Sequence, residues 1–133
     1  MSDATTNPEI ERLGAGSYIA LTTYRKDGSP VTTPVWLSSD GAQLFVWTEA
    51  GSGKVRRLRH DARVQLAPCD ARGALQGTPV EGTAYVVDDP AGVAAIVVRH
   101  KAKYKLMFSL FGTFGRVFRR NSGGHVGIAI TIP

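Results

Sequence analysis

Alternating hydrophobic and polar positions mark the first half of the chain as a series of short β-strands. Residues 18–25 (YIALTTYR) and 29–39 (SPVTTPVWLSS) are rich in β-branched and aromatic residues, and Lys-Asp-Gly lies between them. An Asp-Gly pair supplies the positive φ that a tight hairpin turn requires. A second turn at residues 39–41 (SDG) leads to QLFVWTE at 43–49. The pattern therefore predicts a three-stranded antiparallel meander.

Two segments carry the start signals of helices. Residues 8–14 (PEIERLG) follow Asn7, a good N-cap residue, and begin with proline, which fits the first helical position. Asp89 and Pro90 repeat this signal, and the apolar residues after them keep helical spacing as far as Phe111. Glycines shortly beyond that point predict a break or kink.

Three more strands are predicted at 63–69 (RVQLAPC), 78–89 (TPVEGTAYVVDD) and 125–132 (HVGIAITI). Six strands with short helices between them, and no regular βαβ alternation, predict a mainly β fold, an antiparallel barrel or sandwich. The chain has 133 residues, which a single hydrophobic core can serve. We therefore expect residues 1–133 to form one domain.

Charge changes the picture at a predicted helix of about residues 52–61. The net charge is +5, and five of the sixteen Lys and Arg residues lie within positions 54–63. Cations are unfavourable in the first turn of a helix. However, Ser52, Gly53 and Lys54 offer a hydroxyl, backbone N–H groups and an ammonium together, and a guanidinium follows one turn later. This combination predicts a site for a phosphate or carboxylate.

The alternative interpretation of the same helix is a solvated basic face, in which Arg57 pairs with Asp61 one turn later. The two interpretations differ in whether Arg57 has a carboxylate partner within the chain. The anion site is favoured, because a helix that only covers a surface is more stable with Glu or Asp at its start.

The rest of the composition describes an ordinary globular protein, with 43% hydrophobic and 20% charged residues. The N-terminus is polar and does not resemble a signal peptide, and the apolar run 106–118 is too short to span a bilayer. Cys69 is the single cysteine, so no internal disulfide forms, and no cluster has metal-ligand spacing. We expect a cytoplasmic, metal-free protein in which Cys69 is structural.

Four motifs together resemble the split β-barrel flavin/deazaflavin oxidoreductase family, also called pyridoxamine-5′-phosphate-oxidase-like. They are DG-x-P-V-x-T-P-V-W (27–36), W-T (47–48), S-G-K-x-x-R-L (52–58) and A-P-C-D-x-R-G (67–73). The likeness is close over about 14–89 and looser over 103–120. It points in particular to the branch that uses the deazaflavin coenzyme F420, found mainly in actinobacteria. The resemblance implies a six-stranded antiparallel split β-barrel with short helices.

The resemblance also implies a homodimer with the cofactor in a groove between the protomers, over the strand Val31 to Trp36. Residues of this chain match two sets of cofactor-binding positions. Those expected to hold the ring system and ribityl chain are Val31, Thr33, Pro34 and Val35. Those expected to hold the phosphate are Thr48, Ser52, Gly53, Lys54 and Arg57. Lys103, Tyr104 and Lys105 would help to shape the substrate side.

In this family the cofactor supplies hydride chemistry, here to an electron-poor acceptor such as an enone, a quinone or a tetrapyrrole. F420 carries a phosphate and an oligoglutamate tail, so it is more anionic than FMN. Extra cations at Arg56, Arg59 and 99–105 favour F420, with FMN as the alternative. The catalytic residues are not assigned, although Tyr104, His60 and His100 are candidate proton donors.

Other function classes stay open at this stage. The chain ends at Pro133, without the longer C-terminal region that holds pyridoxal phosphate in true pyridoxamine-phosphate oxidases, so vitamin B6 oxidation is not expected. A non-catalytic coenzyme carrier would show the same motifs. A nucleic-acid-binding small barrel is disfavoured, because the aromatic residues of 104–114 follow helical spacing. Residues 101–120 would suit peripheral membrane contact as a basic amphipathic helix.

Overall fold

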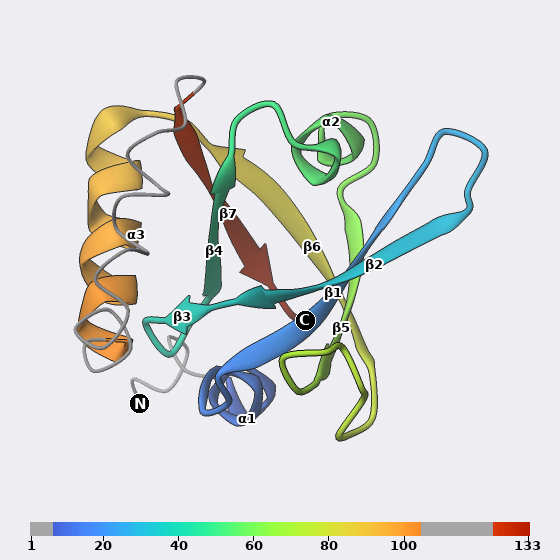
Figure 1. The fold of residues 1–133 in the computed structure, drawn as a ribbon, viewed down its shortest axis with the longest axis horizontal. Coiled ribbons are helices and arrows are strands. Elements are labelled where there is room, and N and C mark those ends of the chain that lie inside the picture. Colours follow the sequence, from blue (N-terminus) through green and yellow to red (C-terminus); the bar gives the residue numbers. More distant parts are fainter. Residues whose placement is uncertain (1–6, 105–123) are drawn as a thin grey trace.

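Seven strands form one antiparallel sheet that curls into a barrel (Figure 1). The computed structural model describes residues 7–104 and 124–133. The order across the sheet is β2-β1-β5-β6-β7-β4-β3, and the neighbouring strands pair antiparallel. The strands are β1 (Tyr18–Tyr24), β2 (Pro30–Trp36), β3 (Ser38–Ser39), β4 (Leu44–Glu49), β5 (Arg63–Pro68), β6 (Val80–Val87) and β7 (His125–Thr131).

The strand predicted at 29–39 is present as β2 and β3, which lie on either side of Leu37. β2 pairs with β1 along its whole length, whereas β3 pairs with β4 at the other end of the sheet order. One continuous run of chain therefore supplies both edges of the sheet. The mainly β, split-barrel fold is confirmed, and the strand count is seven instead of six because this run is divided at Leu37.

The β1–β2 hairpin is built as its sequence predicts. Gly28 has a φ of +88° in the turn, where an L side chain would be strained. β2 has β1 as its one neighbour in the sheet and carries Pro30 and Pro34. Proline has no N–H for a sheet ladder, so it is tolerated in strands mainly at edges. The two prolines therefore suit the edge position of β2.

Three helices accompany the sheet: α1 (Pro8–Gly14), α2 (Gly53–Leu58) and α3 (Pro90–Lys103). The predicted caps are confirmed, because Asn7 Oδ1 accepts the N–H of Glu9 over 2.9 Å and Asp89 Oδ2 accepts that of Gly92 over 2.8 Å. α2 is shorter than the predicted 52–61 and ends at Leu58. The predicted continuation from Lys105 to Phe111, like most of the proposed amphipathic helix 101–120, lies outside the described residues.

The hydrophobic core fills the barrel. Its least exposed side chains come from several strands and include Ile19, Leu21, Leu44, Leu66, Ile128 and Ile130. Burying an aliphatic side chain of this size contributes about 1.5–3 kcal/mol. α1 and α2 lie at opposite ends of the barrel (Figure 1), and each buries two apolar side chains there. α2 is thereby fixed to the barrel by Val55 and Leu58, which leaves its polar face outside.

α3 contacts β3, β4 and β7 from the outer side of the sheet. The approach is close, since a Cβ on Gly127 of β7 would overlap the side chain of Ile96. Within the described residues, no helix combines the length and the apolar character needed to cross a membrane. α3 therefore covers the side of the barrel formed by β3, β4 and β7 (Figure 1).

Candidate functional site

The predicted anion-binding residues lie together where β4 leads into α2. Ser52 caps the helix, and its Oγ accepts the N–H of Val55 over 3.4 Å. Arg57, one turn into the helix, donates from Nε to Thr23 Oγ1 of β1 over 2.7 Å. Lys54, which lies between Ser52 and Arg57 in the sequence, is half-buried. The helix has six residues, so the positive potential here comes mainly from side chains.

The alternative pairing of Arg57 with Asp61 is not formed. Asp61 binds Arg63 instead, through an Nη2–Oδ2 contact of 2.8 Å and the backbone N–H of Arg63. In the part of the chain that the structure describes, neither Lys54 nor Arg57 has a carboxylate oxygen within 4 Å. The interpretation as a self-neutralised helix face is therefore wrong for Arg57.

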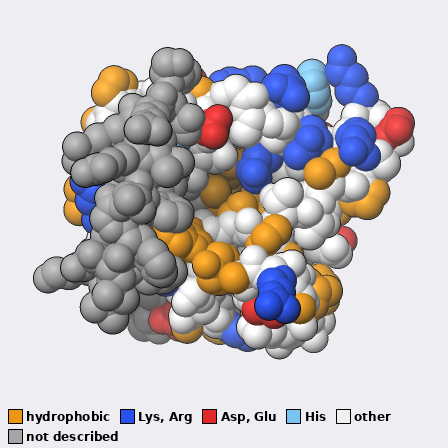
Figure 2. Space-filling view, viewed as in Figure 1, with side chains coloured by type: hydrophobic (Ala, Val, Ile, Leu, Met, Phe, Trp, Pro, Cys, Tyr) orange, Lys and Arg blue, Asp and Glu red, His pale blue; other side chains and the backbone are white. Residues whose placement is uncertain are grey.

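Two further arginines act on this site electrostatically. Burial lowers the pKa of Arg57, and the charges of Arg25 and Arg56 lower it further. Burial also lowers the pKa of Lys54, and so does Arg57, while Glu49 acts in the opposite direction. We call Arg25, Lys54, Arg56 and Arg57 the α2 cation cluster. Figure 2 shows Lys and Arg side chains gathered over α2 and the β1–β2 hairpin. An anion bound here would relieve the mutual repulsion.

Gly53 makes room for the arginine. A Cβ at this position would lie 2.7 Å from Arg57 Nη1, so any other residue would push the guanidinium away from the start of the helix. The backbone N–H groups, the Lys54 ammonium and the guanidinium can therefore approach one small volume. This is the geometry that a phosphate monoester recognises.

Three of the four predicted strand residues share a face with Thr23, the residue that binds Arg57. Paired residues of antiparallel strands project to the same side. Val31 pairs with Thr23, Thr33 with Leu21 and Val35 with Ile19. All three are half-buried, and Val35 packs against the core.

Pro34 and Thr48 are the two other predicted residues. Pro34 pairs with Ala20 and projects to the opposite face of β2. Thr48 lies near the end of β4, the strand that leads into α2, and pairs with Val126. Strand alternation within the predicted strand already separates Pro34 from Thr33 and Val35.

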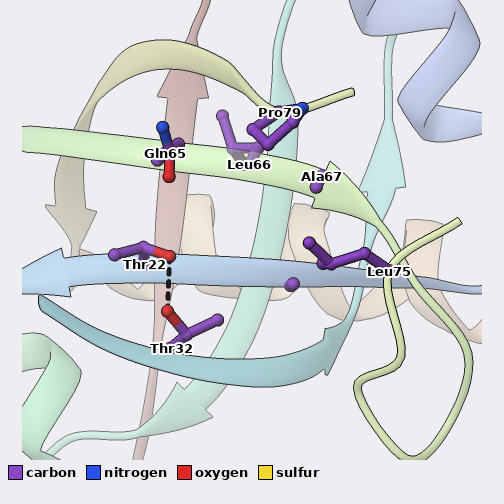
Figure 3. A pocket seen from close by; sticks show the side chains of 8 residues that line it. Thr22, Thr32, Gln65, Leu66, Ala67, Leu75 and Pro79 are labelled. Atoms are coloured by element: carbon purple, nitrogen blue, oxygen red, sulfur yellow. Dashed lines mark hydrogen bonds between the residues drawn. The ribbon is translucent and has the colours of Figure 1, made fainter. Parts of the chain in front are cut away.

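A small cavity lies on the Pro34 side of the sheet. It has a volume of about 100 Å³, and Thr22 and Thr32 project toward each other in it with their Oγ1 atoms 2.7 Å apart (Figure 3). Leu75 and Pro79 line it as well. Sites for drug-sized ligands have volumes of about 300–1,000 Å³, so this cavity is too small for a three-ring cofactor in the single chain.

Known proteins share this architecture. The profile of the family described as pyridoxamine 5′-phosphate oxidase matches residues 7–131 of the chain. The chain belongs to this family. No curated protein sequence matches it.

Solved structures of similar fold extend the comparison. The conserved hypothetical protein Rv2991 from Mycobacterium tuberculosis has 26% sequence identity and a TM-score of 0.69, with 99% of this chain and 84% of that chain covered. A protein described as F420 reductase has 20% identity and a TM-score of 0.66, with 96% of both chains covered. An FAD-binding protein from Mesorhizobium loti has 19% identity and a TM-score of 0.62, with 93% and 85% covered. The last two show the fold alone.

The candidate proton donors of this family member are not gathered at the α2 cation cluster. His100 is buried, which lowers its pKa to about 4, and its Nδ1 lies 2.9 Å from Ser38 Oγ. Burial raises the pKa of Tyr104 to about 12, and its hydroxyl binds backbone groups. Lys103 Nζ donates to two backbone carbonyls. His60 is exposed after α2, and Lys105 lies outside the described residues.

Three further features are Cys69, the potential metal ligands and the tryptophans. Cys69 is buried, which raises the pKa of its thiol, in agreement with a structural role. Over residues 7–104 and 124–133, no group of three or more His, Cys, Asp or Glu residues could hold a metal ion. Trp36 stacks on Tyr104 at 4.5 Å between ring centroids, and Trp47 packs against His125.

Sequence reasoning missed two members of the site, Thr23 and Arg25. Both lie on β1 or the hairpin that follows it, far from α2 in the chain. The hairpin register could have placed Thr23 opposite Val31. Nothing in the sequence indicated that α2 would dock beside that end of the hairpin.

Proposed function

We propose that this protein is an F420-dependent reductase that transfers a hydride from the reduced coenzyme to an electron-poor small molecule, an enone, a quinone or a tetrapyrrole. The observation that carries the proposal is the cation pair Lys54 and Arg57, which has no carboxylate partner among the described residues and lies on the same side of the hairpin as Val31 and Thr33. Bound deazaflavin supplies the hydride chemistry, and the protein supplies binding and orientation.

The residues present fit the phosphate of such a cofactor. Ser52, Lys54 and Arg57 would bind its oxygens, and Gly53 leaves the space that the guanidinium needs. Thr23 holds Arg57 in orientation through its Nε, so the two Nη groups stay available to the anion. The half-buried face of β2 would support the ring and keep water from one side of it.

The choice of F420 over FMN is supported by the additional positive charges beside the expected phosphate site. Arg25 and Arg56 act on Arg57, and Arg57 acts on Lys54. The cluster therefore holds more cations than a single phosphate requires. Arg59, by contrast, lies 3.9 Å from Asp88, and Arg99 lies over the Phe45 ring. An oligoglutamate tail would therefore follow Arg25 and Arg56 in preference to the 99–105 cluster. A flavin with one phosphate would leave these two arginines unused.

We further propose that the protein is a cytoplasmic homodimer and that the partner protomer completes the groove over β2. In the single chain, β2 is an edge strand with half-buried side chains. A second protomer would cover the open side of a ring bound there. Sedimentation of the purified protein with and without coenzyme tests this part of the proposal.

The deciding experiment is a fluorescence titration with oxidised F420, run beside an identical titration with FMN. Lys54→Ala should weaken F420 binding about tenfold or more, because a charge-assisted hydrogen bond contributes about 1.5–3 kcal/mol. Arg59→Ala is the matched control, since it removes the same charge from a solvent-exposed pair. It should change the affinity less than about threefold.

The other outcomes are equally clear. Tight FMN binding with weak F420 binding would keep the site and replace the cofactor. Equal losses in Lys54→Ala and Arg59→Ala would mean that only long-range charge attracts the coenzyme. Tight F420 binding without oxidation of F420H2 by a panel of enones and quinones would indicate a carrier, and binding of neither cofactor would overturn the proposal.

A further inference from the structure

The hydroxyl of Tyr104 binds the backbone of Leu37, which lies between β2 and β3. Its Oη accepts the N–H of Leu37 over 3.0 Å and lies 2.9 Å from the carbonyl oxygen of the same residue. It also lies 2.7 Å from the carbonyl oxygen of Ser17, just before β1. A side chain at the end of α3 thus contacts two separate backbone segments at the break between β2 and β3.

These contacts replace strand pairing at Leu37. A strand residue normally gives its N–H and C=O to a neighbouring strand. Here the N–H of Leu37 donates to the Tyr104 hydroxyl, whose single hydrogen lies within reach of the carbonyl oxygens of Leu37 and Ser17. Leu37 itself is fully buried, so water does not serve these groups. The hydroxyl of Tyr104 therefore lies where β2 ends and the chain turns toward β3.

The ring of Tyr104 reaches the last residue of β2 as well. It stacks on Trp36 with 4.5 Å between ring centroids and an angle of 10° between the planes. Tyr18 pairs with Trp36 across the hairpin, and its ring meets the Trp36 ring edge-on with 6.4 Å between the ring centroids. Trp36 is thereby held between α3 and β1, one residue after Val35.

Lys103 reinforces the same attachment. Its Nζ donates to the carbonyl oxygens of Gly14 and Gly16 over 2.8 and 2.6 Å, in the connection between α1 and β1. The end of α3 is thus bound to the start of β1 and to the end of β2 through two consecutive residues. The end of α3 and the C-terminal end of β2 are thus joined by several side-chain contacts.

We propose that Tyr104 is a positioning residue, which fixes the Val35–Leu37 end of β2 in the shape that the cofactor ring requires. This inference rests on the proposed function, because it gives a role to the strand over which the ring would lie. Tyr104 itself touches no cofactor in this arrangement. Its effect passes through the Leu37 peptide groups and through Trp36.

The test compares Tyr104→Phe, which keeps the stack and removes the hydroxyl, with Tyr85→Phe. Tyr85 is exposed, and its hydroxyl lies 3.4 Å from Gln43 Nε2. The measurements are the affinities for F420, FMN and inorganic phosphate, together with amide hydrogen exchange of β2, all at a temperature where each variant is fully folded. Trp36→Phe, which keeps the hydroxyl contacts, serves as the second variant should Tyr104→Phe not fold.

Tyr104→Phe should weaken binding of the cofactor about tenfold and leave the affinity for inorganic phosphate unchanged, because the α2 cation cluster lies at the far end of β2. Exchange at Leu37 and in β2 should accelerate more than in the rest of the sheet. A merely structural role would lower the unfolding free energy without changing the affinity of the folded protein, and that result would overturn the inference. If the wild-type protein binds neither cofactor, the proposed function fails, and selective exchange in β2 still decides whether Tyr104 positions the strand.

Discussion

Arg57 of α2 donates from Nε to the hydroxyl of Thr23, over 2.7 Å and 34 residues of chain. The bond joins the end of β1 to α2, which carries Gly53, Lys54 and Arg57. Thr23 is 1% exposed, so the arginine is anchored to a rigid part of the barrel. The bond to Thr23 thereby restricts the orientation of the Arg57 guanidinium.

Thr23→Val should therefore weaken binding of a phosphate ligand although it removes no charge. Valine matches threonine in shape, so the barrel keeps its packing, while Arg57 loses the bond that orients it. We expect a loss of about threefold to tenfold in affinity for inorganic phosphate, as for one hydrogen bond of about 1 kcal/mol. Isothermal titration calorimetry measures it, and Thr32→Val, on the opposite face, is the control. Equal affinities of Thr23→Val and the wild type would show that Arg57 needs no anchor.

Gly53→Ala should separate binding from stability. The added Cβ would displace the end of a flexible arginine side chain, while alanine itself favours the helix. We expect unfolding in urea to be unchanged or shifted to slightly higher concentration, with phosphate affinity reduced several-fold. Gly82→Ala provides the contrast, because its Cβ would meet the backbone oxygen of Thr131 at 2.6 Å. That variant should lose stability, and a stable Gly82→Ala would contradict the geometry.

Phosphate binding should weaken at alkaline pH earlier than an ordinary lysine would predict. Burial and the charge of Arg57 lower the pKa of Lys54, so its ammonium loses the proton at a lower pH than a solvated lysine does. Below that pKa, Lys54 is charged and binds the anion, and above it the attraction is lost. Titrations across the alkaline range test this, with Lys54→Arg as the control. A wild-type profile as flat as that of Lys54→Arg would show that Lys54 does not contact the ligand.

His100 should make the fold sensitive to mild acid. Burial lowers its pKa to about 4 in the folded chain, against the value of 6.5 for an exposed histidine. Between these values the unfolded chain binds a proton that the folded chain does not, so stability falls as the pH drops from about 6.5 to 4. The full loss corresponds to about 3 kcal/mol. Urea unfolding of the wild type and His100→Gln across this range measures it, and parallel profiles would refute it.

The fold was predictable because its signals are local. Asn7, Asp89 and Gly28 each determine a cap or a turn within a few residues, and alternation along a strand gives its inward face. The division at Leu37 was not predictable in this way. It depends on Tyr104, which is 67 positions away in the chain.

The site residues also separate into those that local sequence predicts and those that only the folded barrel brings together. Ser52, Gly53 and Lys54 are adjacent in sequence, so their grouping followed from one predicted helix start. Thr23 joins them only because the barrel closes and α2 packs beside β1. Tyr104 is a second example, since its hydroxyl binds backbone groups of Leu37 and Ser17, far from it in the chain.

The prolines of β2 limit how this protein can meet other chains. An exposed strand edge of seven residues would ordinarily recruit a further strand and seed aggregation. Pro30 and Pro34 remove two donors from that edge, so a continuous ladder with a foreign strand cannot form. The open edge of the barrel is thereby protected against fibril growth.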